Sequence, residues 1–216
     1  MKKILKKISA AIIASTTIAI SMASISSSIT ASASTLENKT YRIYFDVSAN
    51  SGVCDFSCRL TSSSGVPMSG FINGTLGGES RYQLEGNGTN SILLTHWGEQ
   101  DLTTPGTLFV VGLVGRNINS PYELADLTYT MVQNYAFVTL PHSRVQTSYV
   151  LIGDVNQDGA VKQDDLILLQ DYLNGTATLS GNALRAADTD GDFGISEADI
   201  TTLNKFLTGK LINFSV

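Results

Sequence analysis

Charged residues are scarce in this sequence, and basic residues are the scarcer kind. Only 15% of the 216 residues are charged and 43% are hydrophobic, a composition that excludes a disordered or collagen-like polymer. The formal net charge of −5 at pH 7 gives no electrostatic reason to bind nucleic acid or an anionic membrane surface. The length leaves no room for a TIM barrel beside a second domain, since that barrel alone takes roughly 200 to 250 residues.

The first 33 residues have the layout of an export signal. Residues 1–7 are basic, residues 8–23 are apolar and uncharged, and an Ala-Ser-Ala triplet at 31–33 offers a cleavage site. We predict a signal peptide over 1–33 and an extracellular protein that is not inserted in a membrane after processing. An uncleaved anchor is the less favoured alternative. Without the four lysines of this segment, 19 acidic residues face ten basic ones, which favours divalent cations as partners.

Only two cysteines are present, and we predict that they form no disulfide. Cys54 and Cys58 lie on the apolar side of an alternating segment, 53–60, that is typical of a half-buried strand. Four strand residues span about 13 Å, about twice the Cα separation that a disulfide tolerates. Both are interpreted as buried apolar side chains. A disulfide, or a metal pair completed by His96 and His142, is the weaker alternative.

The strongest pattern is a tandem repeat near the C-terminus. Between Gly153 and Gly209 the chain repeats itself at an offset of 34 residues. Each unit is an acidic loop followed by an amphipathic helical pattern, which predicts a duplicated structural unit. The recurring residues are Asp154, Asp158, Val161, Asp165, Leu169, Tyr172, Leu173 and Gly175, matched by Asp188, Asp192, Ile195, Asp199, Leu203, Phe206, Leu207 and Gly209.

Oxygen donors occupy positions 1, 3, 5 and 12 of both loops, which are ligand positions of an EF-hand calcium loop. Ca²⁺ is a hard cation that takes about six to eight oxygens, and the carbonyl at position 7 adds one. Because the carboxylates repel one another without the ion, we expect loosely folded loops in calcium-free protein. Solvated acidic turns are the weaker alternative. The predicted ligands are Asp154, Asn156, Asp158, Ala160 and Asp165 in the first loop, and Asp188, Asp190, Asp192, Gly194 and Asp199 in the second.

The second loop departs from the pattern at position 6, where Phe193 stands in place of glycine. The first loop has Gly159 there, which permits the left-handed backbone of a sharp turn. A non-glycine residue in that conformation costs about 1 to 2 kcal/mol. Two outcomes remain open: weaker binding at the second loop, or a turn absorbed by Gly194 with a shifted carbonyl.

A loop with Asp rather than Glu at position 12, followed by a helix and repeated twice, resembles a type I dockerin. The resemblance covers 150 to about 210, within a predicted C-terminal module of 150–216, and is closest at 153–161 and 165–173. It implies a small all-α module with two EF-hand-like calcium loops that binds a cohesin of a cellulosome scaffoldin. Cohesin contacts in the family fall at loop positions 10 and 11 and at the helix exit. These positions, with Leu168 as the expected apolar contact, are Gln163, Asp164, Gln170, Asp171, Glu197, Ala198, Asn204 and Lys205.

The two repeats differ at these positions, so we do not expect the dual, symmetry-related binding of some dockerins. Leu168, for example, corresponds to Thr202. The helical spacing of further apolar residues indicates core packing between the helices rather than partner contact. These residues are Leu166, Leu169, Tyr172 and Leu173.

Residues 35–141 show alternation of period two and no helical pattern. Tyr41, Ile43, Phe45 and Val47 alternate with polar neighbours, and glycine and asparagine clusters separate such segments. We predict an all-β antiparallel sandwich, joined to the C-terminal module by a short linker over 142–149. The other predicted strands are 80–84, 91–97, 107–114, 127–133 and 135–140.

Residues 92–114 resemble the strand, polar loop and strand of cohesin-like modules, and the segment 41–60 fits the same pattern. Carbohydrate-binding modules share the jelly-roll-like sandwich, so the fold leaves both functions open. Trp97 has the shape to stack on a sugar ring, although a lone tryptophan beside a strand end is more often a core residue.

Nothing in the sequence indicates catalysis. Glu99 and Asp101 stand in one turn, and His96 and His142 have no serine or cysteine nucleophile in a recognisable motif. We therefore predict no enzyme activity, with a small glycoside hydrolase as the least favoured alternative. The favoured function is an adaptor whose sandwich receives a dockerin-bearing protein, and the alternative is a subunit that binds plant polysaccharide.

Overall fold

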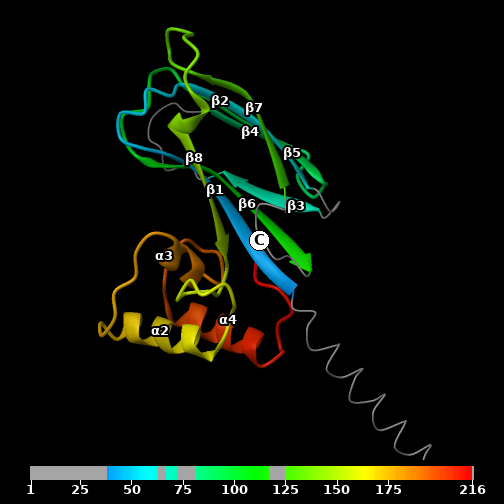
Figure 1. The fold of residues 1–216 in the computed structure, drawn as a ribbon, viewed down its shortest axis with the longest axis vertical. Coiled ribbons are helices and arrows are strands. Elements are labelled where there is room, and N and C mark those ends of the chain that lie inside the picture. Colours follow the sequence, from blue (N-terminus) through cyan, green and yellow to red (C-terminus); the bar gives the residue numbers. More distant parts are fainter. Residues whose placement is uncertain (1–37, 63–66, 73–80, 117–124, 216) are drawn as a thin grey trace, which may run out of the picture. The chain divides into compact units, whose positions relative to one another are not determined.

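The computed structural model describes residues 38–62, 67–72, 81–116 and 125–215 (Figure 1), so the predicted signal peptide lies outside the described residues. Residues 38–216 form one compact unit. We call 38–151 the two-sheet segment and 152–215 the helical segment. The elements are β1 (Asn38–Val47), β2 (Asp55–Ser62), β3 (Met68–Ile72), β4 (Arg81–Glu85), β5 (Ser91–Trp97), β6 (Gly106–Arg116), β7 (Ala125–Gln133), the 3₁₀ turn η2 (His142–Arg144), β8 (Val145–Leu151), α2 (Gln163–Leu173), α3 (Asn182–Ala187) and α4 (Glu197–Leu207).

The two-sheet segment consists of two antiparallel sheets with the strand orders β3-β6-β1-β8 and β4-β5-β2-β7 (Figure 1). The alternation of the sequence explains their shared core, because successive strand residues point to opposite faces. In β5, Ile92, Leu94 and His96 are buried and their neighbours are half-buried. Phe45, Phe56 and Phe109 meet between the sheets, with ring centroids of Phe56 5.9 and 6.1 Å from the other two.

Most strand predictions for this segment are confirmed, and that for 91–97 has the observed bounds of β5. The strand predicted at 135–140 is wrong: these residues form a turn with a single bridge, between Gln133 and Thr139. Both cysteines are free and buried, as predicted. Cys54 packs just before β2, and its Sγ lies 3.2 Å from the carbonyl oxygen of Gly98.

The predicted linker over 142–149 also needs correction, because most of it belongs to β8. This strand pairs with β1 from Tyr41↔Leu151 to Val47↔Val145. Its middle residues Gln146, Thr147 and Ser148 are polar, so the segment lacks the apolar alternation that marks a strand. The two-sheet segment therefore runs into the first acidic loop after only two further residues.

In the helical segment, α2 and α4 lie side by side (Figure 1). Leu166, Leu169 and Leu203 form the buried side of these helices, as the helical spacing of the first repeat predicts. At the start of both helices an aspartate at the third helical position, Asp165 or Asp199, accepts from the N-cap backbone N–H, and in α4 the Ser196 hydroxyl also caps the helix by accepting from the N–H of Ala198. The short helix α3 between them has no counterpart among the predictions.

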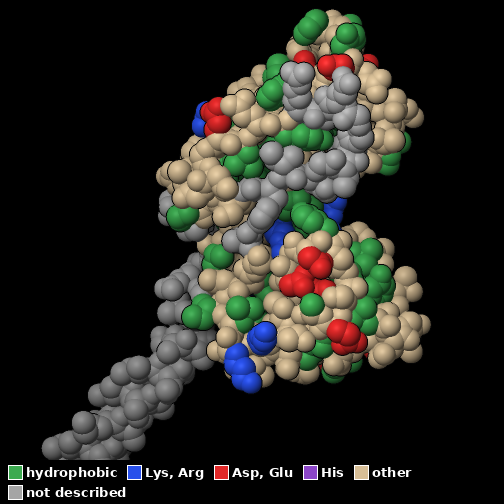
Figure 2. Space-filling view, turned by 180° about the vertical axis from the view of Figure 1, so that it is seen from behind, with side chains coloured by type: hydrophobic (Ala, Val, Ile, Leu, Met, Phe, Trp, Pro, Cys, Tyr) green, Lys and Arg blue, Asp and Glu red, His purple; other side chains and the backbone are tan. Residues whose placement is uncertain are grey.

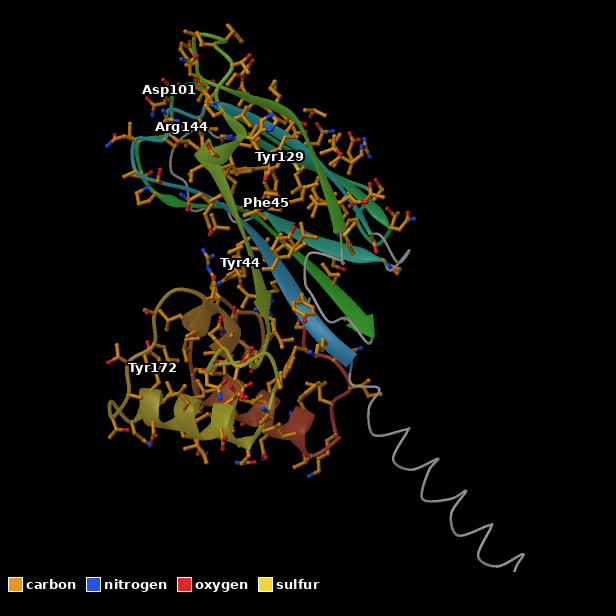
Figure 3. All side chains as sticks on the ribbon, viewed as in Figure 1. Tyr44, Phe45, Asp101, Tyr129, Arg144 and Tyr172 are labelled. Atoms are coloured by element: carbon orange, nitrogen blue, oxygen red, sulfur yellow. The ribbon has the colours of Figure 1, made fainter. Side chains whose placement is uncertain are left out.

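The core of the helical segment is continuous with the outer face of one sheet. Tyr44, Val110 and Val150, from β1, β6 and β8, belong to the same buried cluster as Leu169 and Phe214. Figure 3 shows Phe45 on the side of β1 that faces Tyr129 and the second sheet, and Tyr44 on the opposite side. The polar side of β1 is thus an interface rather than a solvated face.

Among the helices that the structure describes, no helix is long and apolar enough to cross a membrane.

Candidate metal centre

The first acidic loop, 154–165, is folded around the carboxylate of Asp154. Its Oδ1 and Oδ2 accept hydrogen bonds of 2.9 Å from the backbone N–H groups of Asp158 and Gly159. The amide side chain of Gln157 donates to the Asp154 carbonyl oxygen at 2.6 Å. Burial raises the pKa of the Asp154 carboxyl, while these backbone bonds counteract the rise. All donors to this residue are therefore neutral groups of the loop itself.

Two further side chains of the first loop accept hydrogen bonds from backbone N–H groups within the loop. Asn156 Oδ1 accepts from the N–H of Asp158 at 2.9 Å, and Asp158 Oδ1 accepts from the N–H of Ala160 at 3.0 Å. Asp158 also pairs with Lys162 at 2.9 Å on the surface, and this hydrogen bond lowers its pKa. The loop thus presents oxygen atoms at the predicted positions 1, 3 and 5.

The second acidic loop, 188–199, brings three carboxylates together. Oxygen atoms of Asp188, Asp190 and Asp192 all lie within 4.8 Å of one another. Carboxylate oxygens are the donors that a hard cation such as Ca²⁺ takes, so the residues present fit that ion. Burial raises the pKa of Asp188 and of Asp190, because each carboxylate loses water and has acidic neighbours. Figure 2 shows acidic side chains in two separate groups on one face of the helical segment.

The carboxylates at position 12 close the loops onto their helices. Asp165 and Asp199 are fully buried. Asp165 accepts from the N–H groups of Asn156 and Lys162 at 2.9 and 2.7 Å. Asp199 accepts from Thr189 and Ser196, both at 2.8 Å. Each of these aspartates therefore ties the start of its loop to the first turn of the following helix.

Phe193 itself takes the left-handed conformation at position 6, with φ of 67°, where Gly159 has 89°. Gly194 is absent from the described residues with positive φ, so it does not absorb the turn. The strain that the sequence suggests therefore falls on Phe193, whose side chain is 58% exposed. Position 4 is also left-handed in both loops, at Gln157 and Gly191.

Arg42, in β1, contacts the second loop. The sequence analysis does not predict this contact. Its Nη1 donates to the Asp188 carboxylate Oδ2 at 3.0 Å and to the Asp188 carbonyl oxygen at 2.7 Å. Its Nη2 donates to the carbonyl oxygen of Ser215 at 3.0 Å. The two charged side chains are only 3% and 6% exposed. Arg42 occupies a polar position of an alternating strand, which the sequence alone assigns to solvent.

A second cross-segment ion pair lies beside the first. Arg185 of α3 binds both carboxylate oxygens of Asp46 at 2.8 Å, and its guanidinium carbon lies 4.2 Å from the centre of the Tyr44 ring. A hollow of about 320 Å³ between these groups is lined by Tyr44, Thr107, Leu184, Arg185, Asp188, Phe193 and Ile195. The two segments are thus joined by charged contacts as well as by a shared core.

The predicted cohesin contacts lie away from this interface. The exposed ones are Gln163, Asp164, Gln170, Asp171, Glu197, Ala198, Asn204 and Lys205. Leu168 is half-buried and packs partly against the core of the helical segment. Packing of the two-sheet segment therefore leaves this face of α2 and α4 open.

In the two-sheet segment the residues considered for catalysis do not converge. His96 is fully buried, and burial lowers its pKa to about 4. His142 is exposed and stacks on Tyr129 with ring centroids 4.9 Å apart. Asp101 accepts from the backbone N–H of Tyr135 at 2.6 Å, which gives it a structural role in the turn after β7. Trp97 is half-buried on the outer side of β5.

The model of the dockerin type I domain matches residues 152–208, which span both acidic loops and all three helices of the helical segment. No curated protein matches the chain. The C-terminal part of the chain is therefore a type I dockerin, as the repeat suggests. Dockerin domains are non-catalytic modules that bind calcium and attach to cohesins in cellulosome-type complexes.

Proposed function

We propose that this protein is a secreted, non-catalytic component of a cellulosome-type polysaccharide-degrading complex. Its dockerin binds a scaffoldin cohesin in the presence of calcium, and its two-sheet segment serves as an adaptor for a second protein. The observation that carries the proposal is a dockerin whose predicted cohesin contacts are exposed while its opposite side packs on the two-sheet segment.

Both acidic loops are proposed as calcium sites with the ligands predicted from the sequence. In the first loop, Asp154, Asn156 and Asp158 supply side-chain oxygens, and in the second loop Asp188, Asp190 and Asp192 do so. The carboxylates of Asp165 and Asp199 and the carbonyls of Ala160 and Gly194 complete the two sets. The bound ion neutralises the clustered carboxylates and fixes the exposed faces of α2 and α4 for partner binding.

The adaptor role is supported by the outer face of the β4-β5-β2-β7 sheet. This face mixes polar and apolar side chains, among them Arg59, Leu93, Thr95, Trp97 and Thr128. A surface of mixed polarity is typical of protein recognition. In the other sheet, β1, β6 and β8 pack against the helical segment through Tyr44, Val110 and Val150.

Polysaccharide binding is the second candidate, favoured by one observation. Tyr135 and Phe137, in the turn after β7, are 59% and 77% exposed, and Val138 beside them is 55% exposed. Phe137 is held there with a positive φ of 60°, and its backbone N–H donates to the carbonyl oxygen of Asn134 at 3.0 Å. Exposed aromatic side chains of this kind can stack on sugar rings.

The test uses the chain without the predicted signal peptide, residues 1–33. The two-sheet and helical segments are kept in one chain because they share one core. Immobilised scaffoldin cohesins, dockerin-bearing secreted proteins and insoluble polysaccharides are offered in calcium and in EDTA. We expect calcium-dependent capture by a cohesin, and its loss on Gln163→Ala with Asp164→Ala. If the chain with Gln163→Ala and Asp164→Ala still captures a second protein, the adaptor role is supported. If the chain is retained on a glycan and Tyr135→Ala with Phe137→Ala abolishes this retention, the polysaccharide-binding alternative is supported. Failure of every cohesin to bind would overturn the proposal.

A further inference from the structure

The two acidic loops satisfy their first aspartate with different donors. In the first loop Gly159 N–H and the Gln157 amide bind the carboxylate Oδ2 and the carbonyl oxygen of Asp154. In the second loop the guanidinium of Arg42 binds the corresponding two atoms of Asp188. A neutral pair of local donors is thus replaced by one cation from the other segment of the protein.

The sequence of the second loop makes room for this cation. Position 4 is Gln157 in the first loop and Gly191 in the second. A Cβ atom on Gly191 would lie 2.8 Å from Arg42 Nη2. The missing side chain at Gly191 therefore both removes the amide donor that the first loop uses and opens the space that the guanidinium fills.

Arg42 is fixed independently of the Asp188 carboxylate. The carbonyl oxygens of Asp188 and Ser215 hold both of its terminal nitrogens, and the side chain is buried. The neighbouring N–H of Phe214 donates to Thr40 Oγ1 at 3.2 Å and ties the C-terminal residues to the same strand. The positive charge consequently has a defined place next to the second loop whether or not the carboxylate releases it.

We propose that Arg42 is a built-in counter-charge of the second loop, which holds its carboxylates together without calcium and thereby weakens calcium binding there. The inference rests on the proposed calcium function of that loop. Four aspartates, Asp188, Asp190, Asp192 and Asp199, stand at its predicted ligand positions, and one arginine offsets part of their mutual repulsion. The same positive charge repels an arriving divalent cation. The cation of the first loop, Lys162 on Asp158, is by contrast exposed to solvent, which screens its charge.

The experiment isolates the second loop with a background that disables the first. The double change Asn156→Ala with Asp158→Ala removes two exposed side chains that are predicted calcium ligands of the first loop. It leaves the helix cap at Asp165 intact. In this background, Arg42→Gln is titrated with calcium by calorimetry and unfolded by heat in EDTA. We expect calcium binding about tenfold tighter than with Arg42, together with a lower midpoint in EDTA.

Three further variants separate charge from structure. Arg42→Lys keeps the charge and should bind calcium nearly as the parent does. Arg185→Gln breaks the other cross-segment ion pair, with Asp46, and should leave calcium affinity within about twofold. Arg42→Ala with Gly191→Gln gives the second loop the amide donor of the first, and should bind about tenfold tighter even if Arg42→Gln fails to fold.

The outcomes are distinct for the inference and for the proposed function. Equal or weaker calcium binding by both Arg42→Gln and the Arg42→Ala, Gly191→Gln variant overturns the inference, as does an equal gain in Arg185→Gln. If no variant binds calcium at the second loop while a cohesin still captures the parent chain in calcium, the inference fails and so does the proposed second calcium site, whereas cohesin binding by the dockerin stands. If Arg42→Gln raises calcium affinity tenfold but no cohesin captures the parent chain, the inference stands and the proposed function fails.

Discussion

Phe193 carries the clearest local strain in the helical segment. Its φ of 67° is a conformation that a bulky side chain rarely adopts, and most of the ring is exposed. We predict that Phe193→Gly raises the free energy of unfolding by roughly 0.5 to 1 kcal/mol, because relief of strain exceeds the added entropy of the unfolded chain. Urea unfolding in saturating calcium measures this change.

The matched control is Gly159→Ala in the first loop. A Cβ atom there meets no heavy atom within 4 Å, so only the backbone at φ of 89° resists the change. It should lower the free energy of unfolding by about 1 kcal/mol. A destabilising Phe193→Gly would show that contacts of the ring outweigh its backbone strain.

His96 gives the two-sheet segment a dependence on pH. Its pKa in the folded protein is about 4, below the ordinary value of 6.5, because burial disfavours the imidazolium. The unfolded chain therefore binds a proton that the folded chain does not, and stability falls as pH drops from about 6.5 to 4. We predict a loss of about 3 kcal/mol over this range.

His96→Leu removes this titration and preserves an apolar core position. The difference between this variant and the parent, from urea unfolding in calcium-free buffer at several pH values, isolates the histidine from the carboxylates of the loops. Parallel stability curves for the two proteins between pH 4 and 6.5 would contradict the assignment.

Arg42 shows why part of the site escapes sequence analysis. Alternation correctly places Ile43 and Phe45 in the core and Arg42 on the other face of β1. The pattern cannot tell a face covered by water from one covered by another segment of the chain. Loop spacing, by contrast, fixes the ligand positions within twelve residues, so the acidic cluster was foreseen although its arginine was not.

At the scale of elements, the sequence predicts a strand correctly where polar and apolar residues alternate, and it fails where they do not. β5 alternates strictly and was predicted with its observed bounds. Two of the polar residues in the middle of β8 are hydrogen-bonded: Ser148 Oγ accepts from Arg185 Nη1 at 2.8 Å, and Thr147 Oγ1 lies 2.8 Å from the Tyr129 hydroxyl oxygen. The turn after β7 is wrongly predicted as a strand because Tyr135, Phe137 and Val138 are apolar. In the structure all three side chains are exposed.

β8 offers a test of how firmly the two segments are joined. Val150 is 1% exposed and packs in the cluster that contains residues of both segments. We predict that Val150→Ala costs about 2 kcal/mol and shifts two unfolding probes together: Trp97 fluorescence for the two-sheet segment and helical circular dichroism for the other. Gln146→Ala, on an exposed position of the same strand, should change stability by less than about 0.5 kcal/mol. A shift of the helical probe alone would show that the segments unfold separately.

The loops themselves should differ when calcium is removed. With Arg42 in place, the second loop keeps a buried counter-charge, whereas the first loop has only the exposed pair of Lys162 with Asp158. We predict that backbone amides of 188–199 exchange hydrogen more slowly than those of 154–165 in EDTA, and that Arg42→Gln abolishes the difference. Mass spectrometry of the two peptides measures this. Equal exchange in the parent protein would contradict the prediction.

At the scale of the whole molecule, the dockerin is an integrated part of a larger unit rather than a module on a free linker. The chain enters the first loop two residues after β8, and its last residues return to β1 through Phe214 and Ser215. Such continuity would fix the direction in which a second partner is presented relative to the scaffold. Sequence analysis predicted two modules and a linker, because the repeat marks one boundary clearly while nothing local marks the shared interface.

The most direct measurement of the central claim is the number of calcium ions bound by the chain without residues 1–33. The proposed function predicts two ions by calorimetry, with one lost on Asn156→Ala with Asp158→Ala and the other lost on Asp190→Ala with Asp192→Ala. Combining the four changes should abolish calcium binding and the calcium-dependent capture by a cohesin. Two results would contradict the account: no calcium binding by the parent chain, or capture by a cohesin that persists in the variant with all four changes.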